Sequence, residues 1–267
     1  MAETEIPTAE INNRSGLLSM GFMEHLEELR KRIIWSFGSI AAGFFICYFW
    51  HEEIFAWIQK PIVTVLSEHK MSTQLVYTNP VDPFNMYLKI SLIAGIFLAS
   101  PFILYQVWAF IAPGLYKSER RYVGPFMMST VGLFMAGGLF AYKMVYPAAL
   151  SFLVQYSLQF TPMITINEYI NLFMTIVLGL GVIFELPILV FFLALFGVIT
   201  PGWMWRNIRY AVLGIFIVAA AIAPTPDILS MCTFAAPMVV LYLFSIGVAY
   251  VVHPRQRKTR ELKGEGE

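Results

Sequence analysis

The sequence has little charge, and this scarcity excludes most soluble folds. Only 13% of the 267 residues are charged, whereas a typical soluble domain carries about 25%, and 58% of the residues are hydrophobic. A chain this apolar cannot hide its surface from water, so it is predicted to be a polytopic membrane protein. The net charge is +1 and no stripe of basic residues is present, so nucleic acid is not an expected partner.

Cysteine and histidine are also scarce. Cys47 and Cys232 both lie in apolar runs, which favours small buried side chains over a disulfide. The four histidines fall in separate segments without metal-ligand spacing, and no glycine-rich phosphate loop occurs. The sequence therefore predicts no enzyme, no metal site and no cofactor, and the function must depend on polar groups in or near a membrane.

Long apolar runs are what the sequence does have. The predicted fold is all-α, with six transmembrane helices and both termini in the cytoplasm. The runs are 33–50, 90–112, 123–142, 170–196, 210–223 and a sixth that ends at Val252. The fifth run has about 14 residues where a span needs about 20, so the fifth span is expected to be short. The sixth is a second candidate for a short span, because the pattern does not define its start.

The positions of basic residues support this orientation. Most of the 18 lysines and arginines fall in the amino-terminal segment, the second-to-third and fourth-to-fifth connections, and the carboxyl-terminal tail. The positive-inside rule places these segments in the cytoplasm. We expect a disordered cytoplasmic tail over residues 1–21, a membrane domain over 22–252 and a charged cytoplasmic tail over 253–267. In the outer segment 51–89, prolines and short apolar pieces predict short helices that form a cap.

Two acids are predicted at the cytoplasmic surface, and each has two interpretations. Glu119 follows Ser118 at the start of the third span, where a carboxylate favours the positive helix end. Alternatively, Glu119 is an anion that receives a cation. Glu28 is spaced to pair with Arg32 at i,i+4. Because Glu28 and Glu119 are predicted on the same membrane face, the two carboxylates could instead bind two guanidinium groups.

Two further acids lie in unusual places. Glu185 is near the middle of the fourth run, where an ionisable side chain is costly and normally faces a bundle interior or a wet cavity. It is either a carboxyl group hydrogen-bonded to another helix or part of a polar path or cargo cavity. Asp227, in an outer proline-rich turn, is spaced to cap the last helix. The pair Gly137–Gly138 in the third run permits close helix approach.

Five segments together resemble the TatC family, the polytopic subunit of the twin-arginine protein translocase. The resemblance extends from about Met23 to Val252. The segments are His25–Arg32 (HLEELRKR), Tyr105–Pro113 (YQVWAFIAP), Leu115–Arg121 (LYKSERR), Phe184–Pro187 (FELP) and Pro224–Asp227 (PTPD). No other family is expected to combine these motifs in this order on six spans.

The resemblance implies roles for individual residues. Glu28 and Glu119 match the motif acids that bind the paired arginines of a signal peptide, and Arg30 and Phe110 match positions of the same functional region. Outside that region, the residues that match functional positions of the family are Pro61, the mid-membrane acid Glu185 and the outer-turn acid Asp227. Met231 departs from the family, which often has a polar glutamine there, where a small partner subunit docks.

The resemblance also implies a function and partners. The expected protein binds twin-arginine signal peptides of folded cargo at the cytoplasmic face of the bacterial inner membrane. It works with TatA-like and TatB-like single-span proteins, as a homo-oligomer within a larger complex, and uses the proton motive force. The alternative from the residues alone is a proton-coupled small-molecule transporter that uses Glu185, although no internal repeat supports it.

Overall fold

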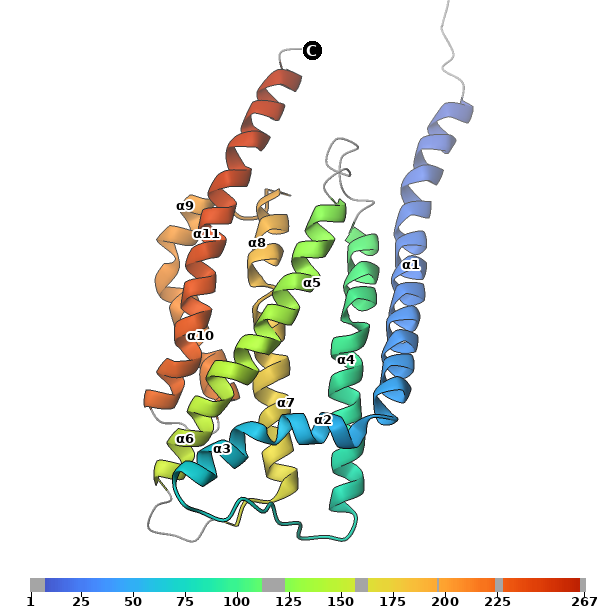
Figure 1. Cartoon of the computed structure of the whole chain (residues 1–267). Helices are drawn as coiled ribbons and strands as arrows, with labels where there is room; N and C mark the ends of the chain where they lie inside the picture. The colour runs from blue at the N-terminus through green and yellow to red at the C-terminus, as the bar shows by residue number, and fades with distance from the viewer. Residues whose placement is uncertain (1–7, 112–122, 157–162, 196, 224–227, 265–267) are drawn as a thin grey trace, which may run out of the picture.

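The chain folds into a bundle of long helices, drawn in Figure 1. The computed structural model describes residues 8–111, 123–156, 163–195, 197–223 and 228–264. Within these ranges the structure is helical, and extended pairing is limited to one isolated bridge between Val76 and Thr165. The predicted all-α fold is therefore confirmed.

The first two long helices, α1 (Thr8–Tyr48) and α4 (Asp82–Ile111), pack against each other over much of the length of α4. They run side by side in opposite directions (Figure 1). The two backbones come closest at Gly43 and Gly95. A Cβ added at Gly43 would lie 2.6 Å from the carbonyl oxygen of Gly95, so neither position has room for a side chain. Small residues at this crossing allow the close packing on which helix association in membranes depends.

A cap of two short helices closes one end of the bundle. After Tyr48 the chain turns by 86° into α2 (His51–Ile58) and α3 (Lys60–Glu68). In Figure 1 these helices cross in front of the lower parts of α4 and α7, and they confirm the short helices predicted for the segment 51–89. We call this the cap end. The opposite end, where α4 stops at Ile111, we call the Glu28 end because Glu28 lies there on α1.

The remaining helices complete the bundle. The third long helix consists of α5, a π-helical turn and α6. The fourth long helix is broken at Phe184 and Glu185 into two pieces, α7 and α8. The break occurs because Pro187 has no N–H to continue the helical hydrogen bonding. The bounds are α5 Val123–Phe140, η3 Ala141–Val145, α6 Tyr146–Tyr156, α7 Ile166–Ile183, α8 Leu186–Leu195, α9 Pro201–Arg206, α10 Ile208–Ile222 and α11 Ile228–Gly264.

Close helix approach at the glycine pair is confirmed. A Cβ added at Gly137 would lie 2.8 Å from the side chain of Phe184 and 2.9 Å from the carbonyl oxygen of Leu180. At Gly138 the ring of Phe97 leaves no space for a Cβ. The pair therefore lets α5 pack tightly against both α7 and α4.

Four helices in the described ranges are long and apolar enough to cross a membrane. They cover 82–110, 127–155, 166–195 and 231–250, and the bent segment from Met23 to Glu68 is a further candidate. α10 has 15 residues and is short, as predicted for the fifth span. The last span has 20 residues, which is an ordinary length, so the possible shortness of the sixth is not found. The total of six spans remains a prediction.

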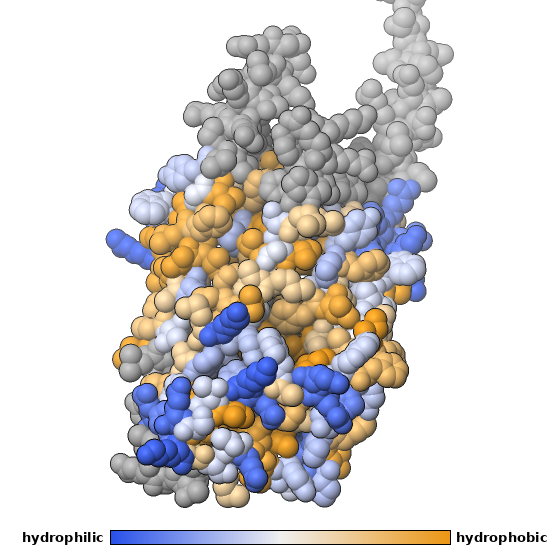
Figure 2. Space-filling view, in the orientation of Figure 1, coloured by the Kyte–Doolittle hydropathy of each residue, from blue (hydrophilic) through white to orange (hydrophobic). Residues whose placement is uncertain are grey.

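The larger cluster of buried hydrophobic side chains lies toward the cap end. There the buried side chains of α3, α4, α6 and α7 form one cluster that includes Ile62, Ile90, Tyr146, Ile170 and Ile176. Figure 2 shows hydrophobic residues over the middle of this face and hydrophilic residues gathered where α2 and α3 lie. This distribution fits a bundle whose middle contacts lipid and whose cap end meets water.

The connections that precede α4 and α7 are tied together at the cap end. The Val76 N–H donates to the carbonyl of Ile164 at 2.9 Å, and the N–H of Ile166 donates to the carbonyl of Val76 at 2.9 Å. Beside this bridge, the buried carboxylate of Asp82 accepts a hydrogen bond of 2.6 Å from the Asn167 amide. The start of α4 is thus joined to the start of α7.

Candidate functional site

Two side chains stack at the Glu28 end, where α1 passes the end of α4. The rings of His25 and Phe110 have centroids 4.3 Å apart and are inclined by 17°. His25 is exposed and Phe110 is half-buried. The stacking connects the amino-terminal motif with the aromatic segment, and it places Phe110 one helical turn or less from the level of Glu28.

A charged pair lies beside this stack. Arg32 donates to Glu28 Oε1 from Nε at 3.0 Å and from Nη2 at 2.5 Å, which confirms the predicted i,i+4 pair. Arg32 Nη1 also donates to Gln106 Oε1 of α4 at 3.2 Å. The side chains of Arg32 and Glu28 are 24% and 32% exposed, so the pair is partly withdrawn from water.

Helical spacing explains why these residues meet. His25, Glu28 and Arg32 are separated by three and four residues, so they share one face of α1. Gln106 and Phe110 are four residues apart and share one face of α4. Since the two helices run in opposite directions, Phe110 meets His25 and Gln106 meets Arg32. The result is a strip of carboxylate, guanidinium, amide and aromatic groups across the two helices.

The strip contains some of the residues that the sequence predicts for the site, and one that the sequence analysis missed. Glu28 and Phe110 were predicted as site residues, and the structure brings them to the same strip. Arg30 is exposed on α1 and makes no ion pair with any residue that the structure describes. Gln106 was missed, although a polar side chain inside the apolar segment ILYQVWAF was the available signal. Glu119 and Asp227 lie outside the described residues.

Glu185 occupies the break between α7 and α8. Its N–H donates to the carbonyl of Val182 at 3.0 Å, so the chain turns tightly there. The carboxyl oxygen Oε1 is buried and has no hydrogen-bond partner among the residues described. The interhelical hydrogen bond of the simpler interpretation is therefore not seen for this oxygen. A buried polar atom without a partner is rare in native proteins.

Pro61 lies at the cap end, far from Glu28. In a continuous helix the N–H of residue 61 would bond to the carbonyl of Trp57, but proline has no N–H. The hydroxyl of Tyr142 donates to that carbonyl at 2.8 Å instead, and the Tyr142 ring stacks on Trp57 with centroids 3.8 Å apart. Tyr169 donates similarly to the carbonyl of Ile58 at 2.6 Å. Pro61 therefore shapes the joint between α2 and α3.

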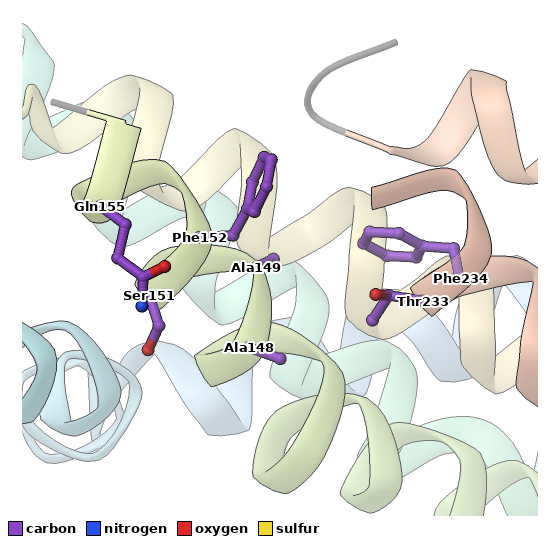
Figure 3. Close-up of a pocket in the computed structure, with 7 residues that line it drawn as sticks. All are labelled: Ala148, Ala149, Ser151, Phe152, Gln155, Thr233 and Phe234. Atoms are coloured by element: carbon purple, nitrogen blue, oxygen red, sulfur yellow. The ribbon is translucent and has the colours of Figure 1, made fainter. Parts of the chain in front are cut away.

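A half-open pocket of about 240 Å³, not predicted from the sequence, lies between α6 and the start of α11. Figure 3 shows side chains from both helices around it. The lining residues are Ala148, Ala149, Ser151, Phe152, Gln155, Thr233 and Phe234. None of them belongs to the strip at the Glu28 end.

Comparison with known proteins gives one consistent result. The sequence model of the family described as "Sec-independent protein translocase protein (TatC)" matches residues 24–237. The TatC protein of Koribacter versatilis (strain Ellin345) is 62% identical over 248 residues, which cover 93% of this chain and 92% of that protein. The TatC protein of Carboxydothermus hydrogenoformans is 38% identical over 238 residues, 89% of this chain and 96% of that protein.

Solved structures agree with the sequence comparison. A crystal structure of the twin-arginine translocase receptor TatC superposes with a TM-score of 0.76 at 35% identity, and the match covers 85% of this chain and 99% of that one. A second crystal structure of the receptor, in the detergent DDM, gives 0.76 at 36% identity. This chain therefore belongs to the TatC family and is a multi-pass inner-membrane component of a protein translocase, not an enzyme.

Proposed function

We propose that this protein is the receptor subunit of a twin-arginine translocase, which binds the paired arginines of signal peptides on folded cargo at the cytoplasmic membrane surface. The observation that carries the proposal is the strip at the Glu28 end. There α1 presents a half-buried carboxylate one helical turn from His25, whose ring stacks on Phe110 of α4. The solved relatives are described as twin-arginine translocase receptors.

Connectivity supports a second carboxylate in the same site. Glu119 belongs to the connection between α4 and α5, and Phe110, close to the end of α4, stacks on His25 of α1. The motif acids Glu28 and Glu119 are therefore proposed to receive one signal-peptide arginine each. Arg30 is proposed to contribute from the exposed face of α1, and Phe110 to contact the peptide beside the arginines.

The strength of such a site depends on its partial burial. An ion pair in full contact with water is worth about 0–1 kcal/mol. A charge-assisted, bidentate pair is worth about 1.5–3 kcal/mol, and the 32% exposure of Glu28 favours the stronger case. Lysine lacks the planar fork that matches a carboxylate, so a paired-arginine ligand should be preferred over paired lysine.

The rest of the translocation machinery follows as part of the proposal. TatA-like and TatB-like single-span proteins join this subunit in a homo-oligomeric complex, and the proton motive force drives transport. Glu185 is proposed to lie in the path of the cargo or its signal peptide, Pro61 to shape the cap and Asp227 to cap the last span. The match to translocase proteins over most of the chain favours this reading over a small-molecule transporter.

Export of a folded reporter tests the proposal. A fluorescent protein with a twin-arginine signal peptide is produced with Glu28→Gln, Glu119→Gln or the matched control Glu27→Gln, an exposed neighbour on α1. Membrane levels of each variant are measured in parallel. We expect export to fall at least tenfold for the first two variants and to remain normal for the control. Normal export by both site variants, at normal membrane levels, would overturn the receptor function.

A further inference from the structure

The guanidinium group already bound to Glu28 belongs to this chain. Arg32 uses all three of its nitrogen atoms, since Nε and Nη2 donate to Glu28 and Nη1 donates to Gln106. A carboxylate proposed to receive arginine thus carries an arginine before any ligand arrives. We propose that Arg32 is a resident competitor for Glu28, which a signal-peptide arginine must displace, and that Gln106 holds Arg32 when it is displaced. This inference rests on the proposed receptor function.

The geometry fits an exchange better than a permanent tie. Both contacts of Arg32 with Glu28 go to one oxygen, Oε1, while Oε2 makes no bond to the part of the chain that the structure describes. An incoming guanidinium can therefore approach Oε2 first and take Oε1 as Arg32 withdraws. Such a route never leaves the carboxylate without a partner.

Gln106 makes the exchange possible for Arg32 as well. Gln106 is 7% exposed, and its amide oxygen accepts from Arg32 across the gap between α1 and α4. A partly buried charge that loses its partner is strongly destabilising. Because Nη1 already contacts Gln106, Arg32 keeps one hydrogen bond when Glu28 turns to the ligand. Gln106 is thus a positioning residue that acts through Arg32.

Competition of this kind lowers affinity without changing which ligand is preferred. A resident that occupies the site reduces the apparent affinity of every ligand in proportion to the fraction of sites that it leaves free. Paired arginine and paired lysine lose affinity by the same factor, so their ratio is set by the contact that each makes with the freed carboxylate. There the planar fork of arginine matches the two carboxylate oxygens, and the lysine ammonium does not.

Binding measurements on the full chain in lipid nanodiscs test the inference. The probes are two fluorescent synthetic signal peptides that differ only in carrying paired arginine or paired lysine. The variants are Glu28→Gln, Arg32→Met and Gln106→Leu, with Lys31→Met as the control for loss of one positive charge on an exposed neighbouring position. Ionic strength is kept constant because these contacts are electrostatic.

We expect Arg32→Met to bind the paired-arginine peptide about twofold to tenfold more tightly than Lys31→Met does. It should bind the paired-lysine peptide with a similar gain, so that the ratio of the two affinities stays unchanged. Gln106→Leu should act in the opposite direction and weaken binding of paired arginine, because Arg32 then depends on Glu28 alone. If Arg32→Met does not reach the membrane at normal levels, Arg32→Gln takes its place, because it removes the guanidinium and keeps a polar side chain at the contact with α4; it too should bind paired arginine more tightly than Lys31→Met does.

The outcomes separate the two proposals. If the wild type does not bind the paired-arginine peptide, or Glu28→Gln binds it as well as the wild type, the receptor function itself fails. If Glu28→Gln loses binding while Arg32→Met binds no more tightly than Lys31→Met, the receptor function stands and the competitor role is overturned. Weaker binding by both Arg32→Met and Gln106→Leu would show that the contact only ties α1 to α4.

Discussion

Removal of the Tyr142 hydroxyl should make the cap helices α2 and α3 open more often. Tyr142 donates to the Trp57 carbonyl, which has no helical donor because residue 61 is proline. The change Tyr142→Phe keeps the ring that stacks on Trp57 and deletes only the donor. The carbonyl then keeps only the Gln59 N–H, which it shares with the carbonyl of Phe55, and the joint between α2 and α3 is weakened.

The exposure of Trp57 sets the size of this effect. Tyr142 is 9% exposed, but Trp57, whose carbonyl loses the bond, is 43% exposed. The loss is therefore the net worth of an ordinary hydrogen bond, about 0.5–1.5 kcal/mol, and not the larger cost of a fully buried group without a partner. A local loss of this size raises the opening equilibrium of the cap about twofold to tenfold.

Hydrogen exchange measures local opening directly. The amides of α3, between Ile62 and Leu66, are followed by mass spectrometry on the full protein in nanodiscs, for the wild type and Tyr142→Phe. Tyr77→Phe, an exposed tyrosine of the same outer segment, is the control. A double-mutant cycle adds Pro61→Ala, alone and combined with Tyr142→Phe. The alanine returns an N–H that can bond to the Trp57 carbonyl.

The cycle has a distinctive expected result. In the Pro61→Ala background, Tyr142→Phe should lower the free energy of cap opening clearly less than in the wild type, because the restored N–H bonds to the same carbonyl. Equal costs in the two backgrounds would show that the hydroxyl and the proline are unrelated. Unchanged exchange in Tyr142→Phe itself would refute the reasoning from the lost hydrogen bond.

Two other predictions follow from packing and burial. Gly43→Ala should destabilise the protein by about 1–3 kcal/mol and reduce its membrane level, because the added Cβ meets the carbonyl of Gly95 at 2.6 Å, whereas Gly132→Ala, where space is open, should have no effect. Immunoblots of membranes and melting in detergent compare them. Glu185→Ala should insert normally but export the twin-arginine reporter less well, and export at the wild-type rate would show that the buried acid has no role in transport.

Features that depend on local sequence could be predicted well. The length and hydropathy of each run predict the long helices, and the 14 or so residues of the fifth run predict the short α10. The break at Pro187 and the joint at Pro61 follow from the missing N–H of proline. The pair formed by Glu28 and Arg32 follows from i,i+4 spacing within one helix.

Features that depend on which helices are neighbours could not be predicted. Arg32 and Gln106 are 74 residues apart, and Trp57 and Tyr142 are 85 residues apart. Apolar runs in a membrane protein show little periodicity because lipid and protein neighbours are both apolar, so the sequence does not tell which face of a run meets another helix. The contact of α1 with α4, and hence the role of Gln106, requires the three-dimensional structure.

The ties between the outer connections have a mechanical consequence. Val76 is bonded to Ile164 and Ile166, and Asp82 to Asn167, so the starts of α4 and α7 are clamped to each other at the cap end. At the Glu28 end, the contact of α1 with α4 is made by side chains: one stacked ring pair and one amide hydrogen bond. Separation of α1 from α4 at the Glu28 end would therefore have to break only these side-chain contacts, whereas separation of α4 from α7 at the cap end would have to break backbone hydrogen bonds as well. A widening between α1 and α4 should begin at the Glu28 end, because the two backbones pack directly on each other at Gly43 and Gly95, nearer the cap end.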